Sequence, residues 1–414
     1  MNNAMSQKNI EGWIASQQQS MVDQLMHLSS INSGTGNLEG LATICDEYYQ
    51  AFAPLSDSIE VLESKSVQRV NHLGQANFEN YGKIISCVKR EDAPIQILLV
   101  GHMDTLFPKD YHFQSPKIVD ESIIHGPGVA DMKGGILVML NALRAFEQVQ
   151  TDNQLGWRVI LNSDEETGSH GSADLLSSAA KNAHAGLIYE PALADGTLVG
   201  ARKGSGNFTL TVHGIAAHAG REISKGRNAI LLMSEAAQTI ASLSDAKRGI
   251  TVNVARVTGG TVFNVVPDQA VCQFNIRCET TGDQQSLAAK LDKIVQELSA
   301  REGYSAVLSG SFSRPPKVIT SANKLLMEWV VECGSAIDVE VKFKDTGGCC
   351  DGNNLAAAGL PNVDTLGVLG AHIHTDKEYM LTQSLSERAK LSFLLLDKLS
   401  RQGEQIISAN TGRS

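Results

Sequence analysis

Three apolar runs of strand length in the first half of this chain each end at side chains that can bind a metal ion or move a proton. IQILLV leads to His102 and Asp104, RVILNS leads to Glu165 and Glu166, and GLIY leads to Glu190. Polar side chains that follow parallel strands gather at the carboxyl edge of an open α/β sheet, where such sheets bind ligands. We therefore expect one site at this edge of a parallel sheet.

Helical and strand-like segments alternate over roughly the first 200 residues. Apolar spacing predicts helices over about 8–30, 36–54, 134–148 and 170–180, and strands over about 58–63, 67–73, 83–89, 95–101, 157–163 and 186–190. Such alternation indicates βαβ units and a mainly parallel sheet flanked by helices, which is an α/β fold.

The pattern changes near residue 204. From there to about 312 the chain reads strand, helix, strand, strand, helix, strand, which is the split ferredoxin-like β-α-β-β-α-β order. After SRPP, a helix over 320–336, strands near 338–344 and 362–367, and a helix over 383–401 are expected to rejoin the first sheet. At 414 residues the chain is long for one core. We predict a larger domain built from 1–203 and 315–414, with 204–314 inserted in it as a smaller domain.

Composition excludes several classes of partner. The formal net charge is −10 and no Lys/Arg-rich run interrupts it, which argues against a nucleic-acid partner. The apolar runs are too short to span a membrane, and the N-terminus lacks a basic and apolar signal pattern. Seven scattered cysteines are typical of a reduced, cytoplasmic protein. The adjacent Cys349 and Cys350 are expected to be ordinary thiols, with a redox or metal role as the alternative.

Individual residues support a metal site. A metal-bound imidazole normally gives its second N–H to a carboxylate, and Asp104 stands two residues after His102. Asp131, in GPGVADMKGG, lies about one βα unit further on and is expected to bridge two ions about 3.5–4 Å apart. A helix N-cap is the alternative for Asp131, and a hydrogen-bonded loop pair is the alternative for His102 and Asp104.

The adjacent pair Glu165 and Glu166 can divide two roles. Neighbouring side chains at a strand end diverge, so one can bind a metal while the other faces a water as general base. A solvated acidic turn is the alternative.

Near the C-terminus either His372 or His374 could be a ligand. Imidazole and carboxylate donors without clustered thiolates suit Zn²⁺ or a similar divalent ion. We expect His112, His125, His170 and His184 to be surface or turn histidines.

A set of motifs then occurs in a characteristic order: HMDT, GxGxxDMKGG, DEExGSxGS, a Glu–Pro strand end, GxxAHAG, GGxxFNVVPD and HTDKEY. In this the chain resembles the di-zinc metallopeptidase superfamily of carboxypeptidases, aminoacylases and deacetylases. It is most similar to the bacterial glutamate carboxypeptidases of the carboxypeptidase G type. The likeness spans nearly the whole chain after about residue 30.

The resemblance implies two Zn²⁺ ions, for which Co²⁺ or Mn²⁺ are substitutes, bridged by Asp131. It assigns His102 and Glu190 to one ion, and Glu166 and His374 to the other. Glu165 would be the general base, Asp104 would support His102, and the Asp131–Met132 peptide would be cis.

The resemblance also implies that the larger domain is a catalytic domain of the phosphorylase/hydrolase-like kind. It implies that 204–314 is a dimerisation or lid domain through which a homodimer forms. His218 would reach the partner subunit's site to stabilise the oxyanion, while Asn264 and Arg277 would bind substrate. The planar guanidinium of Arg277 suits a substrate carboxylate. The local sequence alone predicts that His218 lies in a turn and that Arg277 lies at the exposed end of a strand.

We therefore predict metal-dependent hydrolysis of an amide bond in a peptide or N-acyl amino acid with a free carboxylate, in which Glu165 activates the water between the zinc ions. An N-acyl-amino-acid deacylase or deacetylase is the alternative enzyme. A catalytically inactive binding protein on the same scaffold is less favoured because no ligand or base is missing. A nucleotide-binding protein is excluded because no GxGxxG or GxxxxGK[ST] motif follows a strand.

Overall fold

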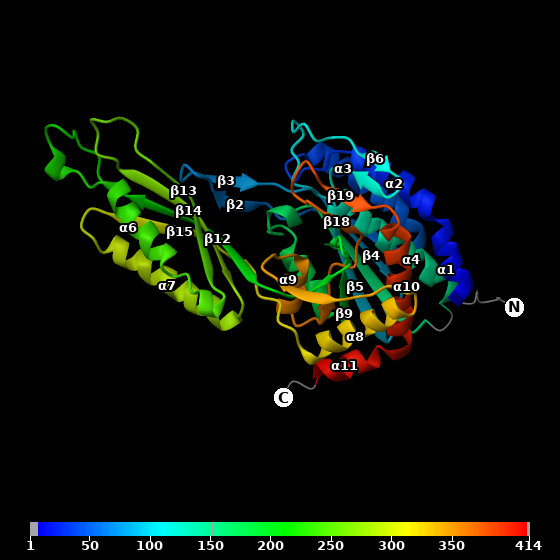
Figure 1. Cartoon of the computed structure of the whole chain (residues 1–414). Helices are drawn as coiled ribbons and strands as arrows, with labels where there is room; N and C mark the ends of the chain where they lie inside the picture. The colour runs from blue at the N-terminus through cyan, green and yellow to red at the C-terminus, as the bar shows by residue number, and fades with distance from the viewer. Residues whose placement is uncertain (1–6, 151–152, 412–414) are drawn as a thin grey trace.

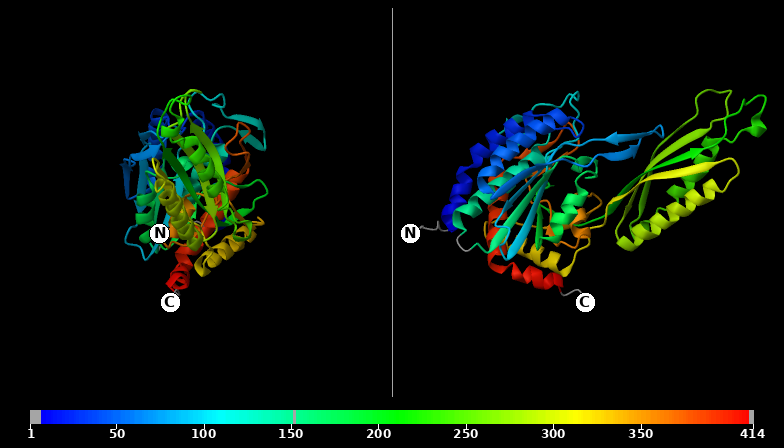
Figure 2. Two further views of the ribbon diagram at one scale, coloured as in Figure 1. Left: turned by 90° about the vertical axis from the view of Figure 1, so that its left-hand side faces the viewer. Right: turned by 180° about the vertical axis from the view of Figure 1, so that it is seen from behind.

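The computed structural model describes residues 7–150 and 153–411. Two bodies lie side by side, a larger one that carries both ends of the described chain and a smaller one formed from its middle (Figure 1). A two-stranded hairpin leaves the larger body and runs to the smaller one, as the view from behind in Figure 2 also shows.

The larger body is built on a six-stranded sheet in the order β1-β4-β8-β5-β9-β17. Strands β8, β5, β9 and β17 are mutually parallel, and only β4 runs antiparallel, to its neighbours β8 and β1. The sheet is therefore mainly parallel, as predicted. The strands are β1 (Ser58–Leu62), β4 (Ile84–Lys89), β5 (Ile95–His102), β8 (Leu155–Asn162), β9 (Ala185–Ile188) and β17 (Asn362–Val363).

Helices cover both faces of this sheet. One face packs against a large apolar core that includes Leu99 and Trp157, and the other packs through Leu98 and Val100 against α5 and α9. Burial of alternate strand residues on opposite faces accounts for the near-continuous apolar runs in the sequence. The helices of the larger body are α1 (Gln7–Ser16), α2 (Gln18–Ser30), α3 (Leu38–Phe52), α4 (Gly135–Val149), α5 (Ala173–Lys181), α8 (Ser321–Ser335), α9 (Asp351–Ala357), α10 (Ser384–Gln402) and α11 (Glu404–Thr411).

Short strands build further small sheets on the larger body. A five-stranded sheet has the order β10-β18-β19-β7-β6, and two-stranded sheets pair β11 with β16 and β2 with β3. Their bounds are β2 (Val67–Val70), β3 (Ala76–Glu79), β6 (Lys117–Asp120), β7 (Ile123–His125), β10 (Ala192–Leu193), β11 (Leu198–Arg202), β16 (Phe343–Thr346), β18 (Leu369–Ala371) and β19 (Tyr379–Leu381).

The smaller body has the predicted ferredoxin-like order. Its elements are β12 (Gly204–His213), α6 (Ala229–Ala241), β13 (Thr251–Gly259), β14 (Gln269–Cys278), α7 (Thr281–Ser299) and β15 (Ser305–Arg314). The antiparallel sheet has the order β13-β14-β12-β15. Phe208, Leu210 and Val212 point to a core shared with α6 and α7. The division of the chain at 204 and 314 stays our proposal.

Several predicted elements differ in detail. The helix expected over 8–30 is two helices, α1 and α2, and the strand expected over 67–73 ends at Val70 because the chain turns there into β3. The strand expected near 338–344 begins only at Phe343, and the one over 362–367 ends at Val363. Helices α9 and α11 and the five-stranded sheet were not predicted, because most of these elements are too short for a periodic pattern. Among the described residues, no helix combines the length and hydropathy that a membrane span requires.

Candidate metal centre and catalytic site

His102 is the last residue of β5, one of the two central strands of the main sheet. Its imidazole is buried, and Nδ1 lies 3.0 Å from the main-chain oxygen of Asp104 and 3.5 Å from the Asp104 carboxylate. The Asp104 carboxylate also accepts hydrogen bonds from the hydroxyl of Thr35 (2.8 Å) and from the backbone N–H of Glu165 (3.2 Å). Asp104 therefore holds both the histidine and the loop of the two glutamates, and the carbonyl is the closer acceptor for His102.

Asp131 lies between β7 and α4, in a turn entered through Gly128 at a positive φ of 71°. Glycine suits this position, because an added Cβ would come within 2.8 Å of the Thr105 side chain. The Asp131–Met132 peptide is cis, as the resemblance implied. The turn presents the Asp131 carboxylate to the carboxyl edge of the main sheet.

Asp131 is shared between two groups of possible metal ligands. One of its oxygens lies 3.2 Å from Nε2 of His102, and the other lies 3.1 Å from Nε2 of His374. Glu190 completes the first group, 3.8 Å from His102, and Glu166 completes the second, 3.2 Å from His374. Within each group the ligand atoms all lie within 4.8 Å of one another. The arrangement is that of two sites joined by one carboxylate.

Crowding of buried carboxylates changes their protonation. Burial, reinforced by repulsion from Asp131, raises the pKa of Glu166 to about 8 and that of Glu190 well above its usual value. Burial also acts to raise the pKa of Asp131, but hydrogen bonds from His102 and His374 outweigh it and bring that pKa below its usual value. Hydrogen bonds to Asp131 and Glu166 raise the pKa of His374 to about 11.

These donors fit a pair of divalent cations. Several carboxylates that share a buried space repel one another unless positive charge compensates them. Three carboxylates and two imidazoles divide here into two sets with no thiolate among them, which suits Zn²⁺ and its divalent substitutes. His102, Asp131 and Glu190 would hold one ion, and Asp131, Glu166 and His374 would hold the other.

Glu165 lies beside this centre but belongs to neither ligand group. Its Oε1 accepts a hydrogen bond of 2.7 Å from Nη2 of Arg314, and the Glu165 carbonyl accepts from the same nitrogen at 3.1 Å. Burial raises the pKa of Glu165 to about 7, although the charge of Arg314 acts to lower it. A carboxylate that titrates near neutral pH and is held by one oxygen is suited to transfer a proton.

Three charged residues around the site were not among the predicted site residues. Arg314, at the end of β15, is buried and pairs with both Glu165 and Asp351. Glu378 is buried and accepts backbone N–H groups of the Asp131 turn. Lys133 is buried and donates to the carbonyls of Leu28 and Ile31, while burial lowers its pKa to about 7. Each contact joins distant segments, so local patterns could not reveal it.

His218 and Asn264 do not join the metal ligands within one chain. They lie on two exposed loops that contact each other, where the N–H of Ala219 donates to the Asn264 carbonyl. Both loops lie beyond the end of β12 that is remote from the larger body (Figure 1). Because β12 has ten residues, these loops stand about 30 Å beyond its start at Gly204.

Arg277 lies at the other end of the smaller body. It is near the end of β14 and pairs with Ser205 at the start of β12. Its guanidinium donates to the carbonyl of Gly347, so it lies at the boundary between the two bodies.

The two adjacent cysteines lie near this boundary. Cys349 donates from Sγ to the Lys203 carbonyl, and Cys350 is buried at the start of α9, where its sulfur accepts from the Gly352 N–H. Both are free thiols.

The remaining histidines are only partly as expected. His112 is exposed and lies 3.0 Å from the Asp376 carboxylate. His125, His170 and His184 are partly buried, and His184 accepts the backbone N–H of Gln96. His170 lies in a turn and His184 in a bend, as expected, whereas the prediction was wrong for His125, which is the last residue of strand β7.

Comparison with known proteins identifies the family of this chain. Residues 98–398 match the family described as peptidase family M20/M25/M40. Over 386 residues the chain is 28% identical to carboxypeptidase G2 of Pseudomonas sp. (strain RS-16), covering 92% of this chain and 89% of that protein. It is 27% identical over 316 residues to succinyl-diaminopimelate desuccinylase of Pseudoalteromonas translucida, covering 72% of this chain and 82% of that protein.

Solved structures share the fold. A tripeptidase from Staphylococcus aureus superposes with a TM-score of 0.72 at 22% identity, covering 93% of this chain and 99% of the other. An M20 family metallo-carboxypeptidase from Sulfolobus solfataricus also has a TM-score of 0.72, at 15% identity, covering 92% of this chain and 99% of the other.

Proposed function

This chain belongs to peptidase family M20/M25/M40 and is a metal-dependent hydrolase, and we propose that it cleaves an amide bond in a peptide or N-acyl amino acid with a free carboxylate. We further propose that the two metal ions are zinc, and that the substrate specificity is similar to that of a glutamate carboxypeptidase. The similarity to carboxypeptidase G2 supports this choice.

One observation carries the proposal. The two oxygens of Asp131 face two different histidines, each accompanied by a further carboxylate. A single-metal structural site would need only one such set and would be closed by its protein ligands. Two sets that share a carboxylate, with Glu165 beside them, are the arrangement used for assisted attack by water.

When bound, the two cations supply Lewis acidity, which polarises a carbonyl and lowers the pKa of water from 15.7 towards about 7. Glu165 then performs the proton transfers. It accepts a proton from the attacking water as the water oxygen bonds to the scissile carbon, and it gives that proton to the leaving nitrogen as the C–N bond breaks. Arg314 fixes Glu165 through Oε1 and leaves the second oxygen for this exchange.

Substrate recognition would come from the smaller body. Arg277 lies at the boundary between the bodies, and its contact with the Gly347 carbonyl can be exchanged for a substrate carboxylate, which a guanidinium binds more strongly. His218 and Asn264 lie too far from their own metal ligands to act there. A homodimer in which they serve the partner's site accounts for their position.

The edge of the smaller sheet supports such a dimer. In the described part of the chain, β13 pairs with β14 on one side only, and most of its residues are exposed. An exposed sheet edge of nine residues readily pairs with another chain. We propose that the homodimer forms through this inserted domain.

A deacylase with the same centre is the second candidate, favoured by the similarity to succinyl-diaminopimelate desuccinylase. The test is a hydrolysis panel with metal-replete protein, comparing N-acetyl amino acids with N-acylglutamates and dipeptides. Faster cleavage of N-acylglutamates and dipeptides supports the carboxypeptidase, and faster cleavage of simple N-acyl amino acids supports the deacylase. No amide hydrolysis by protein that holds two metal equivalents would contradict both.

A further inference from the structure

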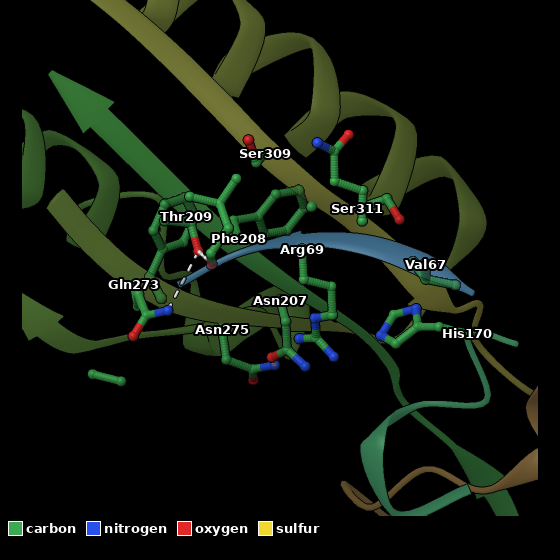
Figure 3. A pocket seen from close by; sticks show the side chains of 15 residues that line it. Val67, Arg69, His170, Asn207, Phe208, Thr209, Gln273, Asn275, Ser309 and Ser311 are labelled. Atoms are coloured by element: carbon green, nitrogen blue, oxygen red, sulfur yellow. Dashed lines mark hydrogen bonds between the residues drawn. The ribbon is translucent and has the colours of Figure 1, made fainter. Parts of the chain in front are cut away.

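A pocket lies between the two bodies, away from the metal ligands themselves. Its volume is about 460 Å³, and its walls are the β2 strand of the hairpin, the loop that carries His170, and the face of the smaller sheet opposite its helices (Figure 3). Pockets of this size hold small-molecule groups. The pocket has no part in the metal binding or the proton transfer described above.

The floor of the pocket is polar. Side chains on alternate positions of neighbouring strands of the sheet point away from the helices, which places amides and hydroxyls on one surface. These residues are Asn207, Thr209, Gln273, Asn275, Ser309 and Ser311. Asn275 donates to Oδ1 of Asn207 at 2.8 Å, which leaves the NH₂ group of Asn207 to donate to something else. A surface that offers this amide group as a donor suits a ligand with acceptor oxygens.

The pocket also carries positive charge. Arg69 lines it and is loosely held, with Nη1 3.6 Å from the Glu79 carboxylate and 3.5 Å from the Thr167 carbonyl. Its guanidinium faces His170, whose buried Nε2 has no hydrogen-bond partner (Figure 3). None of the described residues that line the pocket carries a carboxylate, although the chain has a formal net charge of −10. An anion is therefore the complementary ligand.

The pocket adjoins the catalytic residues. Thr167, whose carbonyl is near Arg69, directly follows Glu166, and His170 lies on the same loop. Since consecutive Cα atoms are about 3.8 Å apart, the Arg69 guanidinium lies on the order of 10 Å from the metal-binding carboxylate. An extended substrate of two or three residues spans that distance.

We propose that this pocket is the subsite for the acyl side of the substrate, and that it binds an anionic group carried on the order of 10 Å before the scissile carbonyl. The inference rests on the proposed amide hydrolysis and specifies its substrate class. Arg69 is the specificity-determining residue, and Asn207 and His170 assist it by hydrogen bonding.

The test is a ladder of substrates in which a succinyl or an acetyl group is joined through zero to three glycines to the C-terminal amino acid that the wild type releases fastest. The ratio of kcat/KM for succinyl over acetyl should rise to about tenfold or more at two or three glycines, because charge-assisted hydrogen bonds give selectivity of that order. Arg69→Met should return the ratio to about one, Arg69→Lys should keep part of it, and Asn207→Ala should lower it.

Lys83→Met is the matched control, because it removes the same charge from an exposed pair with Glu63 that does not line the pocket. A wild-type ratio that stays flat along the ladder would overturn the inference. So would an equal loss for acetyl and succinyl substrates in Arg69→Met, which would mark Arg69 as merely structural.

Calorimetry separates failure of the subsite from failure of the proposed function. The Glu165→Gln protein is titrated with the succinyl and acetyl diglycyl compounds, with and without Arg69→Met. If the wild type hydrolyses no substrate, the proposed function fails, yet tighter succinyl binding that Arg69→Met abolishes still supports the pocket. Equal affinities for the two compounds refute it.

Discussion

The carboxylate of Glu378 binds the backbone of the turn that carries Asp131. Oε1 of Glu378 accepts the N–H groups of Ala130 and Asp131 at 2.9 and 3.1 Å, and Oε2 accepts the N–H of Gly128 at 3.2 Å. Because Glu378 follows His374 by four residues, one loop supplies a ligand to the centre and also fixes the bridging carboxylate.

Replacing Glu378 should therefore weaken metal binding without removing a ligand. In Glu378→Gln an NH₂ group would face a backbone N–H, so the Asp131 turn would lose part of its support. We expect metal affinity to fall about 10–100-fold, as for other residues that orient ligands. Competition with a chromophoric chelator measures this. Glu340→Gln, at an exposed carboxylate, is the control, and an unchanged affinity in Glu378→Gln would contradict the role.

Glu165→Gln should abolish turnover while both metals stay bound. The amide keeps the acceptor for Arg314 but cannot take a proton, so kcat should fall at least about 10²–10⁴-fold. Steady-state kinetics together with metal analysis check this. Activity near the wild-type level in metal-replete Glu165→Gln would exclude Glu165 as the base.

Loss of the bridging residue should differ from loss of a residue that serves one ion. Asp131→Asn removes the charge shared by both groups, and we expect the metal content to fall at both sites. Glu166→Gln should lower it chiefly at the site of His374. Metal analysis after gel filtration distinguishes the variants. Two tightly held equivalents in Asp131→Asn would refute the shared ligand.

Acid stability should depend on Asp364. This buried carboxylate binds Arg202 through both oxygens at 2.9 Å and Lys317 at 2.7 Å. Burial acts to raise the pKa of Asp364, but Arg202 and Lys317 outweigh it and the pKa is lowered. A lowered folded-state pKa stabilises the protein above the unfolded value of about 3.9, and this stabilisation is lost as pH falls through the folded value.

Asp364→Asn should thus cost about 3–5 kcal/mol at pH 7, because two buried cations lose their partner, and should flatten the pH dependence below about pH 4. Urea unfolding at pH 7 and pH 3 measures both effects. Equal destabilisation at the two pH values would argue against the ionised pair.

Mixed dimers test whether His218 acts on the partner's site. His218→Ala and Glu165→Gln homodimers should each be nearly inactive. Random co-assembly makes half of the dimers mixed, and each of these would hold one intact site, so activity should recover to about a quarter of the wild type. No recovery in verified mixed dimers would place His218 outside the partner's site.

The sequence was informative where function depends on a strand end. His102 is the last residue of a buried strand, and Glu165, Glu166 and Glu190 each come shortly after one. The parallel sheet then brings these strand ends together. The family resemblance is confirmed by the match over residues 98–398. The roles given to individual residues stay predictions.

Other parts of the site depend on contacts that no local pattern reports. Arg314 reads as the end of an ordinary strand, and only the packing of β15 against the larger body brings it to Glu165, 149 residues away. The pocket beside Arg69 needs a hairpin whose second strand, β3, has four exposed residues and no apolar alternation. Short or solvent-facing elements leave no periodic signal.

The two histidines of the centre differ in their access to water. The side chain of His102 is 1% exposed and that of His374 is 49% exposed. An ion can leave more quickly from a ligand that swings into solvent than from one locked in the core. The two ions should therefore dissociate in two kinetic phases. The site of His374 should be the one that exchanges its ion faster with ions in solution.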